Sequence, residues 1–382
     1  MSISIRSVEA LAQGETIWDD KVVGFGCRRQ LKGASYVLKY RVHGQQQYLT
    51  LGRHGPLTPD TARRKAKQIL GRVAEGNDPQ AEKAEAKEKA ADTIGKVIDD
   101  YLIYAEKNQK PKSYKGTKRH LKDNWKPLHS TSIFSLTRRQ VANQLRTIEA
   151  GHGQVAAIRA RAALSAMINW AIREGYDLVA NPVQGTNKPE EPKARDRVLA
   201  DEELKAIWNA CGDDDYGCIV RLLILTGQRT AEVGGLARSE ITGDLWTIPE
   251  ERTKNGREHT LPLSAPALAI ISDALRSTNR DFAFGNGPRR RGGRDRGFSG
   301  WSKCKARLDD KLSFTDFTLH DIRRTVSTVM HDKLGVLPHI VEAILNHVSG
   351  HKAGVAGVYN RARYLPQMRD ALERWADHIA SL

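Results

Sequence analysis

The stretch LTGQRTAEV at residues 225–233 is the first of four short motifs in the second half of the chain. TKNGREHTLPLS follows at 253–264, HDIRRT at 320–325, and LNH at 345–347, after which VYNRARY comes at 358–364. Their chemically reactive residues are Arg229, Glu232, Lys254, His320, Arg323, His347 and Tyr359. Each motif alone is weak, because an i,i+3 spacing only places two side chains on one face of a helix. Their combination and order therefore carry more information than any single motif.

The charge of the chain indicates a polyanionic partner. Its 382 residues include 61 Lys+Arg and 45 Asp+Glu, which gives a formal charge of +16. Residues 1–193 carry +13 of this charge and residues 194–382 carry +3. With 40% hydrophobic residues, the chain has enough apolar material for conventional cores.

The sequence predicts a soluble protein without a membrane partner. The longest aliphatic run, at 222–225, is far short of the ~20 residues that cross a bilayer. The first residues lack the charged and apolar regions of a signal peptide, so we expect a cytoplasmic location, associated with the nucleoid. The four cysteines form no CxxC pair, which favours neither a disulfide framework nor a cysteine-rich zinc site.

The first segment combines strands with a helix. Residues 24–55 contain alternating runs between Gly-containing turns, as in antiparallel strands. The alternating positions are Tyr36, Leu38, Tyr40, Val42, Tyr48 and Thr50. Residues 58–76 predict a helix that begins at Thr58 or Asp60. Its apolar face would comprise Ala62, Ala66, Ile69, Leu70 and Val73.

The second segment is predicted to be wholly helical. Residues 92–193 show repeated helical periodicity. They also contain a basic run between Lys107 and Lys126, which could bind a phosphate backbone or could simply form a solvated charged surface. The Arg-rich loop at 289–297 offers the same two alternatives. Across the chain, the candidate DNA-contact residues are Arg28, Arg29, Arg63, Arg64, Lys112, Lys115, Lys118, Arg119, Lys122, Arg289, Arg290 and Arg291.

The third segment is predicted to be mostly helical with one hairpin. Residues 245–264 alternate on both sides of Asn255-Gly256, a sequence typical of a tight turn, which would put Lys254 at the tip of the first strand. The segment contains no GxxxxGK[ST], GxGxxG or HExxH motif. No cofactor and no metal site are therefore expected.

Together the motifs resemble those of the tyrosine recombinase (integrase) family, whose catalytic domain is similar to residues 194–382 throughout. VLADEELKAIW at 198–208 and the terminal stretch at 359–379 add to this likeness. The terminal stretch and the amino-terminal segment resemble the subgroup of prophage and genomic-island integrases typified by phage P4. One departure is Asn346, where the family usually has glycine.

The resemblance implies a multidomain, mainly α fold. A small α/β domain of strands plus a helix would bind arm-type DNA, a helical domain would bind the core site, and a mostly α catalytic domain would contain a small antiparallel sheet. The expected boundaries are 1–80 for the arm-binding domain, 81–91 for a helical linker, 92–186 for the core-binding domain, 187–196 for an interdomain linker and 197–382 for the catalytic domain.

The resemblance also implies how the reactive residues act. Arg229 and Arg323 would hold the scissile phosphate, since two guanidiniums can stabilise the charge that builds on its oxygens. Tyr359 would be the nucleophile and His320 its base, because a tyrosine hydroxyl has a pKa near ~10. Lys254 would donate a proton to the departing 5′ hydroxyl, and His347 would form a hydrogen bond to the phosphate. Glu232 would orient an arginine or a histidine.

The implied reaction is integration, with excision, of a prophage or genomic island. It would pass through a 3′-phosphotyrosyl intermediate and a Holliday junction in a homotetramer on double-stranded attachment sites, of core and arm type. ATP would not be needed, because the bond energy is stored covalently. A metal would not be needed either, because Arg229 and Arg323 stand where a metal ion would otherwise be required. A DNA-bending host factor and an excisionase are the further partners that the resemblance suggests.

Several alternatives remain open at this stage. The chain could be a metal-dependent nuclease or transposase that uses Asp213, Asp214 and Asp215, or a DNA-binding regulator without catalysis. Tyr364 is a second candidate for the nucleophile. The last helix could pack on its own domain or on a neighbouring protomer, through Leu365, Met368, Leu372, Trp375 and Ile379.

Overall fold

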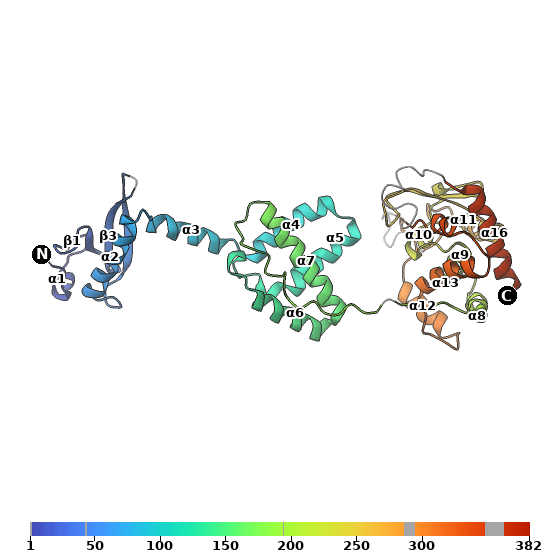
Figure 1. Cartoon of the computed structure of the whole chain (residues 1–382), viewed down its shortest axis with the longest axis horizontal. Helices are drawn as coiled ribbons and strands as arrows, with labels where there is room; N and C mark the ends of the chain where they lie inside the picture. Colours follow the sequence, from blue (N-terminus) through green and yellow to red (C-terminus); the bar gives the residue numbers. More distant parts are fainter. Residues whose placement is uncertain (1, 43, 194, 286–294, 348–362) are drawn as a thin grey trace. The chain divides into compact units, whose positions relative to one another are not determined.

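The computed structural model describes residues 2–42, 44–193, 195–285, 295–347 and 363–382. The chain forms two compact units, Met1–Lys193 and Ala194–Leu382 (Figure 1). Each unit is described by itself below.

The first unit begins with a four-stranded antiparallel sheet. The strands lie in the order of the sequence: β1 (Thr16–Trp18), β2 (Phe25–Gln30), β3 (Gly33–Val42) and β4 (Gln45–Arg53). Two helices accompany them, α1 (Ile5–Glu9) and α2 (Pro59–Ala74). Thr58 caps α2 by accepting from the Thr61 N–H, so the first of the two predicted caps is confirmed. Ala62 and Ala66 of α2 are fully buried in the core that the sheet helps to form.

Strand β3 buries the alternating residues that the sequence pattern singled out, whereas β4 buries the residues between them. In β3, Tyr36 and Leu38 are fully buried. In β4, Leu49 and Leu51 are buried, whereas Tyr48 and Thr50 are exposed. A change of one residue exchanges the two faces of a strand, so the pairing with β3 decides which face is inside.

The rest of the first unit is helical, as predicted. It contains α3 (Pro79–Ala91), α4 (Ile94–Asn108), α5 (Pro111–Arg119), η1 (His120–Asn124), η2 (Lys126–Leu128), η3 (Ile133–Ser135), α6 (Arg138–His152) and α7 (Gln154–Arg173). Within the described residues, only α7 is long and apolar enough to cross a membrane by length and composition. It lies instead in this helical core: Leu164 and Met167 are fully buried, and the Trp125 indole N–H donates to Ala160 O at 2.9 Å.

The second unit is mostly helical around a small sheet. Its elements are α8 (Asp201–Ala210), α9 (Asp215–Thr226), α10 (Thr230–Gly234), η4 (Arg238–Glu240), β5 (Ile241–Thr242), β6 (Leu245–Ile248), β7 (His259–Pro262), α11 (Ala265–Arg276), α12 (Trp301–Asp309), α13 (Leu319–Asp332), α14 (Pro338–Ile344) and α16 (Leu365–Ser381). The three strands are antiparallel in the order β5-β6-β7. The fold class is thus confirmed as multidomain and mainly α, with two small antiparallel sheets.

The predicted hairpin exists, but its turn is wider than expected. Strand β6 ends at Ile248 and β7 begins at His259, so Lys254 lies in a ten-residue loop and not at the end of a strand. Asn255-Gly256 therefore does not form the two-residue turn that its sequence favours. Asn255 instead forms a hydrogen bond with Asn346, 91 residues further along the chain.

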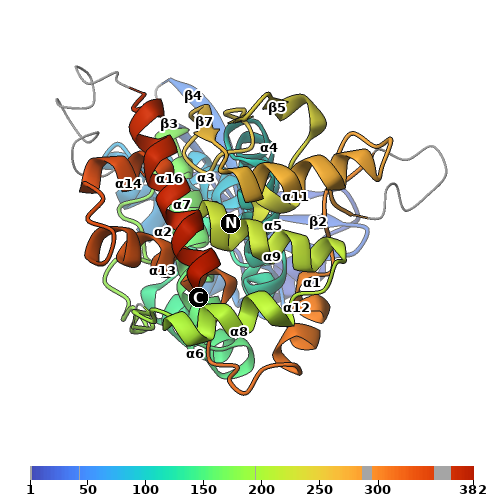
Figure 2. The same ribbon diagram turned by 90° about the vertical axis from the view of Figure 1, so that its right-hand side faces the viewer.

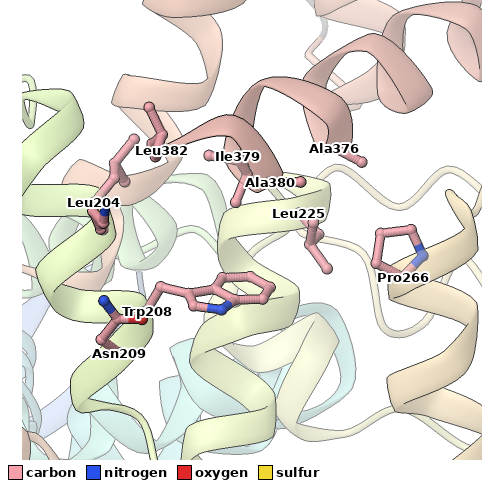
Figure 3. A pocket seen from close by; sticks show the side chains of 10 residues that line it. Leu204, Trp208, Asn209, Leu225, Pro266, Ala376, Ile379, Ala380 and Leu382 are labelled. Carbon is pink, nitrogen blue, oxygen red and sulfur yellow. The ribbon is translucent and has the colours of Figure 1, made fainter.

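The last helix packs on its own unit. Helix α16 lies against α9, α14 and β7 (Figure 2). Its Trp375 indole N–H donates to Ile224 O at 2.7 Å. The predicted apolar face is buried at Met368, Leu372, Trp375 and Ile379. Beside its last turn is a cavity of about 340 Å³, which α8 and α9 also line (Figure 3). Of the two packing alternatives, this structure has the one within the chain.

Candidate active site

The end of α9 positions Arg229. Gly227 follows the helix in the left-handed conformation, with φ +62°, and its N–H donates to Leu223 O. A side chain at this position would have to fit within 2.9 Å of the Leu345 side chain, so glycine suits both the backbone and the packing. The turn leads directly to Arg229, the N-cap residue of α10.

Glu232 fixes the conformation of Arg229. One carboxylate oxygen accepts from the Arg229 backbone N–H at 3.0 Å and the other accepts from its guanidinium at 2.9 Å. Glu232 is only 2% exposed, whereas the Arg229 side chain retains 21% exposure. The carboxylate thus orients an arginine whose end is still accessible to an anion.

Arg323 connects three separate segments. It lies on α13, is 4% exposed, and donates from Nη1 to Gly227 O at 2.7 Å and from Nη2 to Leu345 O. Burial, followed by the charge of Arg229, lowers the pKa of this guanidinium to about 9, and Glu232 partly opposes the shift. Arg323 therefore remains protonated at neutral pH, and its positive charge is close to that of Arg229.

The carboxyl end of α14 positions His347. Asn346 follows the helix in the left-handed conformation, with φ +48°, and the His347 N–H donates to Glu342 O at 3.0 Å. This is the turn with which helices commonly end, and asparagine is the residue that adopts it most readily after glycine. Asn346, the departure from the family pattern, is therefore compatible with the backbone that a glycine would adopt.

Side chains from distant segments satisfy the last carbonyls of α14. Gln228 donates to Ile344 O at 2.8 Å, and His259 Nε2 lies 3.0 Å from the same oxygen. Arg323 donates to Leu345 O, and Asn255 donates to Asn346 O at 3.1 Å. Helix ends leave such carbonyls without partners within the helix, so these side chains hold the end of α14 against α9, α13 and the β6–β7 loop.

The electrostatics show that the two histidines belong to the same site. Partial shielding from water, then Arg324 and Arg323, lower the pKa of the His320 imidazole, although the residue is exposed. Burial, then Arg323 and Arg229, lower the pKa of His347 to about 4. Both imidazoles are neutral at neutral pH, and a neutral imidazole can accept or donate a proton. The structure thus brings Arg229, Arg323, His320 and His347 together.

Tyr359 and the arginines at 289–291 lie outside the described residues. Tyr364, the second candidate nucleophile, is described: its ring lies 5.1 Å from that of His339, and it packs at the edge of the core of this unit, at the start of α16. These contacts give Tyr364 a packing function.

Arg63 requires a correction among the candidate DNA contacts. Its guanidinium pairs with the fully buried carboxylate of Asp19 at 2.8 Å, donates to Ile3 O, and is 12% exposed. Burial raises the pKa of the Asp19 carboxyl, but Arg63 and two backbone N–H groups outweigh it and lower that pKa to about 2. Arg63 therefore holds the first sheet, the chain start and α2 together, and we remove it from the DNA contacts.

The other candidates in the first unit lie at its surface. Lys112, Lys115, Lys118 and Arg119 are exposed on α5, and Arg64 is exposed on α2. Lys122 is partly engaged by Asp99. Arg28 is exposed on β2 while Arg29, its neighbour, is partly buried. Lys39 and Arg41 were missed: their alternation with buried Leu38 and Tyr40 places them on the outward face of β3, which was the available signal.

The three consecutive aspartates have separate structural functions. Asp214 caps α9 by accepting from the Gly217 N–H at 2.8 Å, and Asp213 pairs with Arg221. Asp215 accepts from the Gly285 N–H at 2.6 Å. Among the described residues, no group of His, Cys, Asp and Glu side chains could hold a metal ion. The carboxylates thus do not converge as the nuclease alternative requires.

The sequence matches known protein families over most of the chain. Residues 197–364 match the phage integrase family and residues 3–86 match an arm DNA-binding domain. The chain is a site-specific tyrosine recombinase, as its motifs predicted.

Two relatives and one solved structure illustrate the likeness. Prophage integrase IntZ of Escherichia coli (strain K12) is 29% identical over 361 residues, which cover 90% of this chain and 86% of IntZ. Prophage integrase IntA of the same strain is 32% identical over 165 residues, or 42% of this chain and 38% of IntA. The crystal structure of a lambda integrase tetramer bound to a Holliday junction shares the fold, with a TM-score of 0.56 at 18% identity, over 89% of this chain and 97% of that one.

Proposed function

We propose that this recombinase integrates and excises a prophage or genomic island of the phage P4 type, through a 3′-phosphotyrosyl intermediate. The convergence of Arg229, Arg323, His320 and His347 at the end of α14 is the observation that carries the proposal. Four groups that can bind or protonate a phosphate lie together. The neighbouring acids that affect their pKa values are Glu232, Asp321 and Glu342.

The two arginines supply the charge that the reaction requires. In this proposal Arg229 and Arg323 bind the non-bridging oxygens of the scissile phosphate, and His347 donates a hydrogen bond to the same phosphate. Because a guanidinium has five N–H donors, Arg323 can hold the carbonyls of Gly227 and Leu345 and still donate to an oxyanion. Glu232 keeps Arg229 in place.

The covalent step is balanced by two proton transfers. The Tyr359 oxygen attacks phosphorus while its proton passes to His320, whose lowered pKa keeps it neutral and able to accept. The bond from phosphorus to the 5′ oxygen breaks, its electron pair goes to that oxygen, and Lys254 supplies the proton. A 5′ hydroxyl of the partner strand then attacks the phosphotyrosine and gives its proton to Lys254. The bond from phosphorus to the Tyr359 oxygen breaks, and that oxygen takes the proton back from His320.

We further propose that the reaction takes place in the cytoplasm, at the nucleoid, in a tetramer on core-type DNA. Residues 1–80 would bind arm-type sites, and residues 92–186 would bind the core site, with linkers at 81–91 and 187–196 and the catalytic domain at 197–382. The match of residues 3–86 to an arm DNA-binding domain supports the first assignment. A DNA-bending host factor and an excisionase would set the direction of exchange.

The outward face of the first sheet suits an arm site. Arg28, Lys39 and Arg41 lie on the face opposite the buried core, together with Tyr48 and Thr50. Cations and hydrogen-bonding side chains on one open sheet face are what a protein needs in order to bind phosphates and base edges. In the core-binding domain, the exposed cations of α5 would bind the backbone of the core site.

The test is covalent capture of DNA. A nicked duplex from the junction between the integrated element and its host chromosome serves as the core suicide substrate, and adducts are resolved on a denaturing gel. We expect Tyr359→Phe to bind this substrate without forming an adduct, because only a phenol oxygen can attack phosphorus. EDTA should leave the wild-type yield unchanged, since the arginines supply the positive charge.

Tyr364→Phe is the matched control and should give a normal adduct. Normal yield in Tyr359→Phe together with loss in Tyr364→Phe would show that the nucleophile is assigned to the wrong tyrosine. Loss of cleavage in EDTA would favour a metal-dependent nuclease instead.

A further inference from the structure

The β6–β7 loop has an internal brace. The Thr253 hydroxyl donates to Glu250 O at 3.1 Å and accepts from the Arg257 N–H at 3.1 Å, and Thr253 is 2% exposed. The loop is thereby closed below its tip, which consists of Lys254, Asn255 and Gly256. The tip is thus presented by a folded loop.

One side chain of the tip binds the turn that carries His347. The Asn255 amide Nδ2 donates to the side-chain oxygen of Asn346 at 2.9 Å and to its carbonyl oxygen at 3.1 Å. Asn255 is the residue after Lys254, and Asn346 is the residue before His347. Directly after the loop, His259, the first residue of β7, contacts Ile344 O of the same helix end. The loop tip and the strand that follows the loop are therefore both attached to the end of α14.

The left-handed turn explains why Asn346 can serve as a partner. At φ +48° glycine would be free of strain but would offer only its carbonyl to Asn255. Asparagine tolerates this backbone and adds a second acceptor, the Oδ1 atom. The substitution of the family's usual glycine thus adds a bond between two segments that are 91 residues apart.

We propose that Asn255 and Asn346 are positioning residues, which hold the Lys254 loop at a fixed place beside His347 so that the proton donor meets the 5′ oxygen. This inference rests on the proposed function, in which Lys254 protonates that oxygen. Neither asparagine touches DNA in the proposal. Both act through the placement of Lys254, because a misplacement of ~1 Å can cost a reaction about a hundredfold in rate.

The test uses two versions of the core suicide substrate that differ in one atom. In the second version sulfur replaces the 5′-bridging oxygen of the scissile phosphate. A thiol has a pKa near ~8.5, far below that of an alcohol, so the thiolate leaves without receiving a proton. A variant whose defect is proton donation is slow on the oxygen substrate and normal on the sulfur substrate. A variant with a general structural defect is slow on both.

We expect Asn255→Ala in the full-length chain to form adduct roughly ten- to a hundredfold more slowly on oxygen DNA, and within about twofold of wild type on sulfur DNA. Asn346→Gly keeps the turn and one acceptor, so its defect should have the same pattern but be smaller. The double variant should be no slower than Asn255→Ala alone, because both changes remove bonds of one amide. Asn209→Ala, the same kind of change at an exposed site on α8, is the matched control and should be normal on both substrates.

The Lys254→Ala variant distinguishes a failure of the positioning proposal from a failure of the proposed function. If Lys254→Ala recovers on sulfur DNA while Asn255→Ala is normal on oxygen DNA, or is equally slow on both, the positioning proposal is wrong and the proposed function stands. If Lys254→Ala does not recover on sulfur DNA, the role of Lys254 in the proposed function is wrong, and the positioning proposal with it. If Asn255→Ala fails to fold, Asn346→Gly gives the same decision, because glycine is compatible with this turn.

Discussion

At the scale of single residues, the site is built from side chains that have a structural and a chemical use at once. Arg323 holds the carbonyls of Gly227 and Leu345, which come from the ends of α9 and α14. Its charge also acts on His320 and His347 by lowering the pKa of each imidazole. The bonds that place Arg323 therefore also fix the electrostatic environment of the groups that transfer protons.

This environment predicts a pH dependence. A histidine must be neutral to act as a base. The pKa of His320 is lowered from the ordinary histidine value of 6.5, so the imidazole stays mostly neutral to a lower pH than an ordinary histidine does. We expect the second-order rate constant for adduct formation, at subsaturating DNA, to fall to half of its plateau only below that value. Such a rate constant reports on the DNA-free enzyme.

The measurement is a pH–rate profile on the oxygen substrate, with Lys254→Ala on the sulfur substrate as the control in which the proton donor no longer contributes. Protonation of His320 should affect both in the same way. A profile whose midpoint lies at or above pH 6.5 would contradict the assignment of His320 as the base.

At the scale of elements, the junctions between helices matter more for the site than the helices themselves. Gly227 follows the last residue of α9 and Asn346 lies two residues after the last residue of α14, both in the left-handed conformation. The two turns present Arg229 and His347, and Arg323 of α13 bonds to the carbonyl of Gly227 and to that of Leu345. Strain at either turn should therefore be transmitted to the arginine between them.

Substitution of Gly227 tests this view. Gly227→Ala would create strain at φ +62° and would place Cβ 2.9 Å from Leu345 Cδ2 and 3.1 Å from Val326 Cγ1. We expect α9 and α13 to lose about 2–4 kcal/mol of stability, since both backbone strain and overpacking act. Hydrogen exchange of the amides in these helices, in the full-length chain, measures the loss.

Gly243→Ala is the matched control for the backbone term. Gly243 has nearly the same φ, +60°, but nothing lies within 4 Å of the added carbon. It should cost only about 1–2 kcal/mol, and only near β5 and β6. Equal costs at the two positions would show that packing around Gly227 is not part of the constraint.

At the scale of the whole molecule, the two units use their charge differently. The first unit carries +13, and α5 and the outward face of β3 present cations to solvent. The second unit carries +3, and several of its cations are paired or buried, as Arg229 and Arg323 are. In the proposed function, broad binding of a polyanion therefore belongs to the first unit, and recognition of one phosphate to the second.

The division predicts separable activities. Deletion of residues 1–80 should abolish binding to arm-type DNA and leave cleavage of the core suicide substrate by Tyr359, because the sheet has a core of its own. Gel-shift assays on arm-type DNA and the adduct assay on core DNA measure the two activities.

The full-length double variant Lys39→Ala, Arg41→Ala is the control without truncation. It should also lose arm binding, since it removes two cations from the outward face of β3. Loss of core cleavage in the deletion variant would mean that the first 80 residues are not a separable module.

Local sequence alone accounted for much of this protein. Helical periodicity and a capping residue such as Thr58 define where helices begin, because caps and apolar stripes act within a few residues. The order of the motifs was sufficient to identify the family. It also identified the residues that the structure brings together around Arg323.

The tertiary structure decided what depends on partners far away in the chain. Sequence spacing does not reveal that Asp19 removes Arg63 from the surface across 44 residues, or that pairing with β3 buries Leu49 and Leu51 in place of Tyr48 and Thr50. Nor does it reveal that Asn255 forms a hydrogen bond with Asn346 and lies in a wide loop in place of the tight turn that its local sequence favours. In each case a long-range bond or buried contact outweighs a local preference of about 1 kcal/mol, and only the folded chain brings those partners together.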